Sequence, residues 1–311
     1  MALAGQRAAP GAGLARARRR RRRGETATAL GFLAPNAIGF LAFTLGPIAG
    51  SLVLSFFSWP LLSSPSFVGL DNYANLLTRD RVFHQVLFNT LYFVFVYVPL
   101  NLVISMGLAV WLSGRVRGAN LFRVLFFMPV VTPMVANALI WTLLYQPRDG
   151  LFDRLLLAVH LPAPNWLGTF AWAMPSVIAM SLWAGFGYNL LVFSAGLRAV
   201  PKDLYDAASV DGATGWQQFW RVTLPLLTPS VFFALVLTLI SSFQVFTQPY
   251  VLTDGGPGDS TTTLVLSLFD NAFRFYRMGY ASAIAWFLFV LIMLVTAFQF
   301  VTQRRWVHYD F

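Results

Sequence analysis

Six apolar runs without a charged residue alternate with more polar segments along this chain. The runs occupy residues 27–58, 86–113, 124–146, 167–197, 222–253 and 278–303. Each run reaches the ~20 residues that a helix needs to cross the hydrocarbon core of a bilayer. The pattern predicts an all-α membrane protein with six transmembrane helices over residues 27–303.

The composition supports a multi-pass membrane protein. Hydrophobic residues make up 57% of the 311 residues and charged residues 11%, whereas a soluble domain has about a quarter charged residues. The sequence contains no cysteine, which excludes disulfides, cysteine-ligated zinc and thiol chemistry. The net charge of +10 is concentrated at the N-terminus, so it indicates contact with membrane lipid or a targeting signal, and not binding of nucleic acid.

The distribution of basic residues predicts the orientation in the membrane. Residues 1–26 include an unbroken run of arginines at 18–23, and we expect this Arg-rich tail to be disordered and cytoplasmic. With the N-terminus inside, 16 of the 22 Lys and Arg residues fall on cytoplasmic segments. Six spans then place the tail at 304–311 in the cytoplasm as well. The following apolar run is too long for the ~7–15-residue core of a cleaved signal peptide.

Polar side chains within the runs are candidates for a translocation path. They are Asn89, Asn137, Asn189, Gln244, Gln248 and Tyr250. An unpaired amide in hydrocarbon costs several kcal/mol, so the polar face of the fifth run is expected to look into the bundle interior or a hydrated cavity. Ser241, Gln244 and Gln248 are spaced to share one face of a continuous helix. For this face, hydrogen bonding between helices is the alternative to a role in the translocation path, and the sequence leaves both open.

Paired prolines mark the third run. Pro129 and Pro133 free backbone carbonyls of a helix, which then need donors from neighbouring groups. We therefore expect this region to lie inside the bundle and not against lipid.

The segment 203–227 follows the fourth run, overlaps the first residues of the fifth, and has the pattern of helix, turn and helix. Asp203 suits a helix start, because the positive end of the helix dipole favours acids. Gly212 suits the left-handed position that follows a helix end. Thr214 and Gln217 have the spacing of a capping box for a second helix. The predicted orientation places this segment in the cytoplasm.

This segment resembles the EAA loop of the membrane subunits of ABC importers. The residues in register with that loop are Ala207, Ala208, Gly212, Val222, Leu224 and Pro225, with Asp206 where the family usually has Glu. The resemblance implies a coupling helix that docks in a groove of a cytoplasmic ATPase. The residues that it assigns to coupling are Asp203, Asp206, Ala207, Ala208, Asp211, Gly212 and Pro225.

Two further stretches are similar to sugar-importer permeases. One is Phe-Val-Gly-Leu-Asp-Asn-Tyr at 67–73, and the other runs from Thr-Asp-Gly-Gly-Pro at 253–257 to Gly-Tyr-Ala-Ser-Ala at 279–283. The resemblance implies the type I ABC importer fold in a bacterial cytoplasmic membrane. It also implies the partners: a second homologous permease, two ATPase subunits that hold ATP and Mg, and an extracytoplasmic solute-binding protein. The chain itself is expected to bind no cofactor.

The sequence lacks motifs for nucleotide hydrolysis and metal binding, which reduces the number of possible functions. The sequence has no Walker A motif, and its one lysine, Lys202, does not follow a Gly-rich loop, so we expect ATP hydrolysis on another polypeptide. Its three histidines lack metal-ligand spacing, and no catalytic residue is predicted. A neutral sugar is favoured over glycerol-3-phosphate or a polyol derivative, because no basic residue lies within a span. A secondary transporter is the alternative from another class, although ion-coupled carriers usually need charges inside the membrane.

Overall fold

The computed structural model describes residues 30–114 and 116–307, which form two compact units divided after Leu54. The first unit contains one apolar helix, Leu30–Leu54, with a π-helical turn η1 (Leu41–Leu45) leading into α2 (Gly46–Leu54). The predicted tail at 1–26 and residues 308–311 lie outside the described residues. The second unit contains the remaining elements and is described by itself below.

The second unit opens with a short hairpin that the prediction of an all-α fold did not include. Strands β1 (Phe57–Ser58) and β2 (Ser66–Phe67) pair antiparallel, and helix α3 (Asp71–Thr78) follows. The Asn72 amide donates to the backbone oxygens of Ser55, at 2.8 Å, and Phe57, at 2.9 Å. These bonds hold α3 against the first strand. The motif at 67–73 therefore connects the hairpin to α3 through hydrogen bonds.

Long apolar helices build the core of the second unit. These are α4 (Arg81–Ser113), α8 (Phe170–Ala199), α11 (Leu224–Phe243) and α14 (Met278–Thr302), and the first three pack against one another. Asp80 caps α4 by accepting a hydrogen bond from the Phe83 amide at 3.0 Å. Across the described residues, five helices are long and apolar enough to cross a membrane, and a bent pair brings the total to six. The predicted number of spans therefore depends on that pair.

The third predicted span is not one straight helix. Helices α5 (Ala119–Val131) and α6 (Met134–Leu144) meet at a bend of 100°. Thr132 precedes Pro133 and takes an extended backbone conformation, because a proline disfavours the helical conformation of the residue before it. The Asn137 side chain donates to the carbonyl of Pro129 at 2.9 Å. The carbonyl that Pro133 leaves without a backbone donor is thus hydrogen-bonded, as expected. Pro129 is buried but Pro133 is exposed, so the expected position inside the bundle is found for Pro129 alone of the two prolines.

The fifth predicted span is also interrupted. Helix α11 ends at Phe243, and α12 (Thr247–Thr253) begins after a break of three residues. Pro249 has no backbone N–H for the carbonyl of Val245 and its ring disfavours a continuous helix there. That carbonyl instead accepts a hydrogen bond from the Thr263 hydroxyl at 2.8 Å. The prediction that Ser241, Gln244 and Gln248 share one helix face is therefore wrong.

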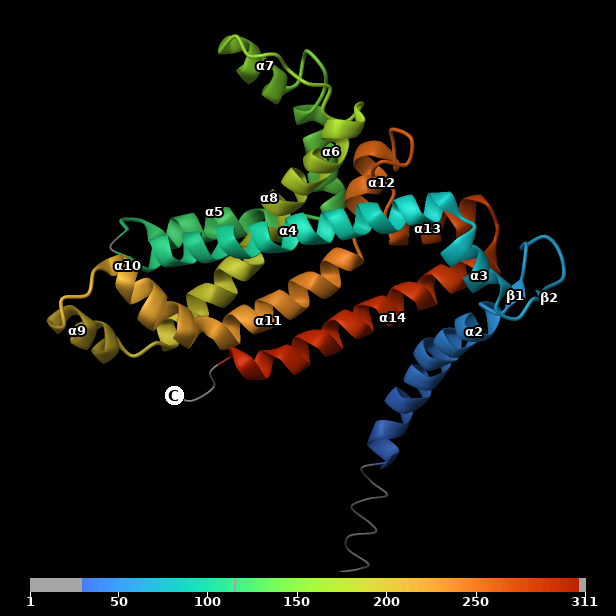
Figure 1. Cartoon of the computed structure of the whole chain (residues 1–311), viewed down its shortest axis with the longest axis horizontal. Coiled ribbons are helices and arrows are strands. Elements are labelled where there is room, and N and C mark those ends of the chain that lie inside the picture. The colour runs from blue at the N-terminus through green and yellow to red at the C-terminus, as the bar shows by residue number, and fades with distance from the viewer. Residues whose placement is uncertain (1–29, 115, 308–311) are drawn as a thin grey trace, which may run out of the picture. The chain divides into compact units, whose positions relative to one another are not determined.

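The connecting elements lie at opposite ends of the second unit (Figure 1). Helices α9 (Lys202–Val210) and α10 (Gly215–Gln218) lie at one end of the α4–α11 layer, and the π-helical turn η2 (Phe219–Thr223) joins α10 to α11. Helix α3, the hairpin and α13 (Leu264–Phe269) lie at the other end, followed by the π-helical turn η3 (Asp270–Arg274). The short η4 (Gln303–Arg305) ends α14 on the α9 side.

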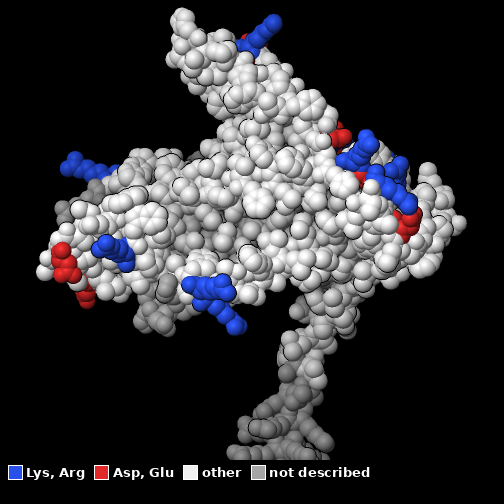
Figure 2. Space-filling view, viewed as in Figure 1, with Lys and Arg blue, Asp and Glu red and all other residues white. Residues whose placement is uncertain are grey.

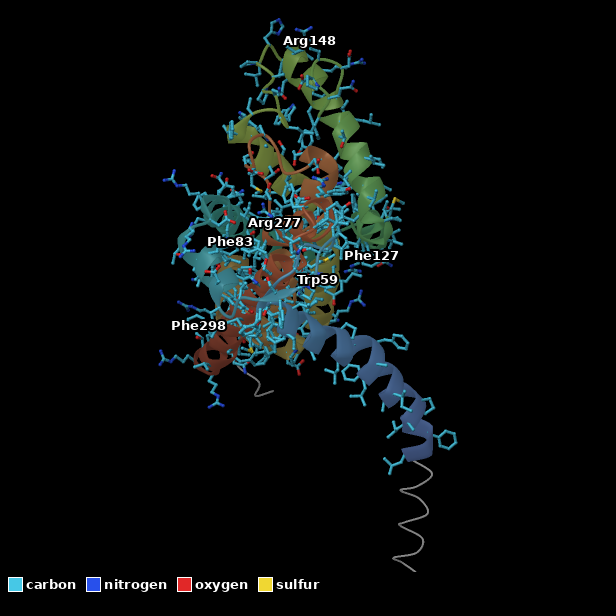
Figure 3. The ribbon with its side chains drawn as sticks, turned by 90° about the vertical axis from the view of Figure 1, so that its right-hand side faces the viewer. Trp59, Phe83, Phe127, Arg148, Arg277 and Phe298 are labelled. Atoms are coloured by element: carbon cyan, nitrogen blue, oxygen red, sulfur yellow. The ribbon has the colours of Figure 1, made fainter. Side chains whose placement is uncertain are left out.

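Charged side chains follow the same division. On the face shown in Figure 2, they form groups at the left end, at the right end and at the lower edge left of the middle, and the broad surface between these groups is uncharged. A further group lies on the extension formed by α6 and α7 (Leu151–Ala158), where Figure 3 labels Arg148 near the tip. A band without charge between two charged rims is the surface that a bilayer requires.

Candidate functional site

The segment 203–227 folds as the predicted helix, turn and helix. Helix α9 ends at Val210, and the Ala213 amide donates to the Ala208 carbonyl at 2.9 Å. Gly212 has a φ of +75°, the left-handed conformation that glycine adopts at the lowest cost. The predicted capping box is present: the Thr214 amide donates to Gln217 Oε1 at 2.8 Å, and the Gln217 amide to Thr214 Oγ1 at 3.4 Å. Local sequence thus sets the geometry of this segment.

Side-chain hydrogen bonds join α9 to the elements that follow it. The side-chain nitrogen of Gln218, Nε2, donates to Ser209 Oγ at 2.9 Å, and the hydroxyl groups of Tyr205 and Thr223 are 3.0 Å apart. Because η2 continues directly into α11, these hydrogen bonds connect α9 to a long helix of the bundle. Pro225 lies in the first turn of α11, where a proline is tolerated.

The outer surface of this segment is acidic and apolar. Asp203, Asp206 and Asp211 are exposed, and none forms an ion pair with a described residue. Ala207 is exposed and Ala208 is half-buried. Sequence reasoning missed the apolar members of this surface, which are Leu204, Val210, Trp216 and Trp220. Val210 is 88% exposed and Trp216 is 71% exposed, so large apolar side chains are exposed on the same segment as the acids. The sequence signal that could have indicated this apolar surface is the presence of large apolar residues in an otherwise polar segment.

Asn189 lies at the centre of a hydrogen-bond cluster that joins three helices. Its amide nitrogen donates to Asn101 Oδ1 on α4 and to Thr238 Oγ1 on α11, both at 2.7 Å. The Asn101 amide in turn donates to the Tyr97 hydroxyl at 3.2 Å. Asn189 is only 2% exposed. Its observed contacts are those of a hydrogen-bonded connection between helices.

Asn89 and Asn137 are also buried, in separate places. The Asn89 amide donates to the carbonyls of Asp259, at 2.7 Å, and Thr262, at 3.0 Å, and so holds the loop before α13 against α4. Asn137 closes the bend between α5 and α6, as described above. The three asparagines therefore do not form one site within this chain.

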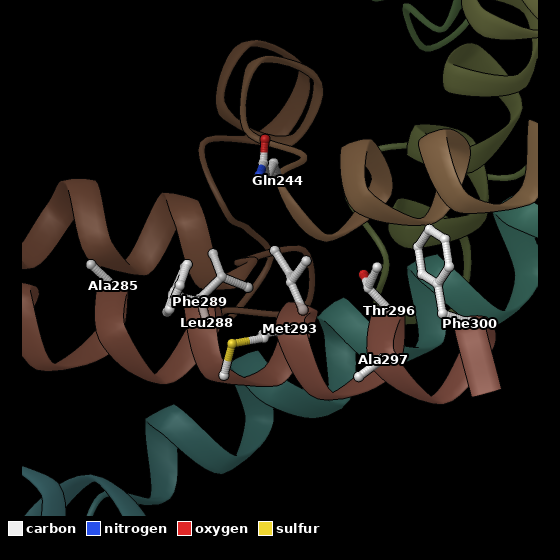
Figure 4. Close-up of a pocket in the computed structure, with 9 residues that line it drawn as sticks. Gln244, Ala285, Leu288, Phe289, Met293, Thr296, Ala297 and Phe300 are labelled. Carbon is white, nitrogen blue, oxygen red and sulfur yellow. The ribbon is translucent and has the colours of Figure 1, made fainter. Parts of the chain in front are cut away.

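Gln244 lies on an open groove beside α14 (Figure 4). The groove has a volume of about 590 Å³ and is lined by Gln244, Ala285, Leu288, Phe289, Ile292, Met293, Thr296, Ala297 and Phe300. Gln244 follows the end of α11, so the break in the fifth predicted span is what presents its side chain here. The groove is apolar apart from two uncharged polar side chains.

Gln248 and Tyr250 lie on α12, beyond the break. Gln248 is half-buried and Tyr250 is 36% exposed. The Arg274 guanidinium lies 5.5 Å from the centre of the Tyr250 ring, and it contacts Asp254 at 2.6 Å and Asp270 at 3.2 Å. Burial raises the pKa of the Asp270 carboxyl, and the charge of Arg274 partly offsets this. Sequence reasoning missed this cluster, which fixes Tyr250 at the surface.

The described residues contain no group of three or more His, Cys, Asp or Glu side chains placed to hold a metal ion.

Comparison with known proteins identifies the class. Residues 101–308 match the family described as binding-protein-dependent transport system inner membrane component. A probable ABC transporter permease of Bacillus subtilis, YesP, is 40% identical over 283 residues, which cover 90% of this chain and 91% of that one. The trehalose/maltose transport permease MalF of Thermococcus litoralis is 35% identical over 257 residues, which cover 82% and 86%.

A solved structure has the same fold. It is the bacterial alginate ABC transporter in complex with an alginate pentasaccharide-bound periplasmic protein, with a TM-score of 0.79, 21% sequence identity, and coverage of 92% of this chain and 96% of that one. Fold and sequence together define a multi-pass inner-membrane transport subunit with the permease fold of ABC importers. The chain belongs to the family of binding-protein-dependent transport system inner membrane components.

Proposed function

We propose that this chain forms half of the translocation path of an ATP-driven importer for a sugar, and that a separate ATPase docks on α9 and α10. The exposed acidic and apolar surface of α9–α10, tied to the bundle by hydrogen bonds, is the observation that carries the proposal. Both termini would lie in the cytoplasm. ATP and Mg would be bound by two ATPase subunits, and a second permease and an extracytoplasmic solute-binding protein would complete the assembly.

The geometry supports a mechanical route from the ATPase to the path. Residues Gly215–Phe243 form one near-continuous helical stretch from α10 through η2 to α11. Thr238, near the far end of this stretch, is hydrogen-bonded to Asn189 on α8. A push on α9 would thus rotate α11 together with α8 and α4. In this proposal Asp206 faces a basic ATPase residue, Ala207 and Ala208 permit close approach, and Gly212 returns the chain to the membrane.

The character of the groove supports a neutral solute. Its two polar members, Gln244 and Thr296, are uncharged, and no Lys, Arg, Asp or Glu lines it. A second permease that covers this groove would enclose a path in which the Gln244 amide can bond sugar hydroxyls. The relative from Thermococcus litoralis is a trehalose/maltose transport permease, which fits this choice. Glycerol-3-phosphate would require a basic partner that the groove does not supply.

The orientation can be tested directly because the natural chain has no cysteine. Val210→Cys and Ser64→Cys each introduce one exposed thiol, at opposite ends of the second unit. We expect a membrane-impermeant maleimide to label Ser64→Cys in intact cells and Val210→Cys only after the membrane is opened. Labelling of Val210→Cys from outside would contradict the cytoplasmic docking of α9.

The role of the groove is tested by Gln244→Ala. Loss of one hydrogen bond to a bound solute costs about 1 kcal/mol, so we expect uptake at limiting sugar concentration to fall roughly fivefold with little change in melting temperature. Gln146→Ala, an exposed glutamine outside the groove, is the matched control. Unchanged uptake with a lower melting temperature would assign Gln244 to helix packing. Uptake that requires a proton gradient and no ATPase would instead support a secondary transporter.

A further inference from the structure

A second cavity lies behind α9, on the side that faces the bundle. It has a volume of about 580 Å³, and its walls come from α4, α5, α8, α9, α10 and η2. Three basic side chains line it: Arg123, Arg198 and Lys202. No acidic residue lines it, and none of the three cations forms an ion pair with a described residue. We call this space the α9 cavity.

Two polar atoms of the cavity wall are buried without a hydrogen-bond partner among the described residues. They are Ser194 Oγ and Arg123 Nε. Ser194 is 7% exposed. The other guanidinium nitrogens of Arg123 are held in place, since they donate to Asn120 Oδ1 at 2.9 Å and to the Leu112 carbonyl at 3.2 Å. A buried donor without a partner costs about 1–3 kcal/mol, so an acceptor that enters the cavity and reaches either atom after a small side-chain rotation would recover part of this cost.

We propose that the α9 cavity binds a phosphate-bearing anion. A phosphate group presents several charged oxygens, which can accept hydrogen bonds from an arginine, a lysine and a hydroxyl at once. The volume suits a lipid headgroup or a small phosphate compound and excludes a macromolecule. The cavity lies where α4 and α8 end, at the rim of the apolar band, so both a lipid headgroup and a dissolved phosphate can reach it.

Such an anion would join α9 to the bundle. Lys202 belongs to α9, whereas Arg123 belongs to α5 and Arg198 to α8, so one bound phosphate bridges three helices. The bridge would stiffen the segment that carries the proposed ATPase contact. Its effect on uptake rests on the proposed coupling function, but the binding of the anion does not.

The full chain, stripped of lipid in detergent, provides the binding test. Thermal unfolding is followed with inorganic phosphate against chloride at matched ionic strength, and in nanodiscs of phosphatidylglycerol against phosphatidylcholine. The variant Arg198→Gln/Lys202→Gln removes two cations of the cavity. The control Arg304→Gln/Arg305→Gln removes two exposed cations at the same end of the unit, outside the cavity. Ser194→Ala removes the unpartnered hydroxyl and leaves the charge unchanged.

Each cation removed should weaken binding of the anion about tenfold. Stabilisation by inorganic phosphate that is lost in the cavity variant and kept in the control identifies a dissolved phosphate as the ligand. Stabilisation by phosphatidylglycerol alone, with the same pattern, identifies a lipid headgroup. An equal response of the cavity variant and the control, or no response of the natural chain, overturns the proposal. If the natural chain binds the anion but does not bind an ATPase, the result counts against the proposed function and not against the anion site.

Discussion

Val210→Asp is expected to reduce ATP-driven uptake about 100-fold while the chain still inserts and folds. The Val210 side chain is 88% exposed, so the substitution removes no packing within this chain. If an ATPase covers α9, the new carboxylate would be buried there without a partner, at a cost of about 3 kcal/mol or more. Co-purification of the ATPase and sugar uptake in proteoliposomes are the measurements.

The matched control for this prediction is Val159→Asp. Val159 is 63% exposed, follows α7, and lies on the extension beyond α6, away from α9. The same change in charge and size at that position should leave the ATPase bound. If Val210→Asp retains full uptake and a bound ATPase, the docking surface lies elsewhere and the coupling role of α9 must be abandoned.

Asn189→Ala is expected to lower the free energy of unfolding by about 2 kcal/mol. The substitution removes hydrogen bonds to Asn101 and Thr238, and it leaves their acceptor atoms buried. Hydrogen bonds between helices in membranes contribute about 0.6 kcal/mol on average and up to about 2 kcal/mol each. Unfolding in mixed micelles, with the variant at equal expression, measures the loss.

A double-mutant cycle separates this hydrogen-bonded connection from a general effect on packing. Thr238→Val keeps the shape of the side chain and removes the hydroxyl, so its coupling energy with Asn189→Ala should be about 1 kcal/mol. Ser181→Ala is the matched control, since among the described residues the Ser181 hydroxyl is bonded to the Val177 carbonyl of its own helix alone. Additive effects of Asn189→Ala and Thr238→Val, with uptake lost at unchanged stability, would favour a place for Asn189 on the path.

Patterns that are local in sequence predicted the long helices and the helix–turn–helix geometry of residues 203–227. The charge-free runs anticipated α4, α8 and α14, since a helix that crosses hydrocarbon must satisfy its own backbone and carry apolar side chains. The positive φ of Gly212 and the Thr214–Gln217 capping box were also predictable, because both depend only on residues within a few positions.

Where the polar side chains of the spans point was decided by tertiary structure. Hydrophobicity gives no sign of a break in a helix, so the prolines at 133 and 249 appeared to lie within continuous spans. In the structure, Asn137 and Thr263 donate the hydrogen bonds that these prolines cannot supply from the backbone. Asn189 and Gln244 were indistinguishable as amides in apolar runs. The packing of α4, α8 and α11 buries the first, and the end of α11 exposes the second beside α14. The α9 cavity likewise needs residues from six elements, which no local pattern brings together.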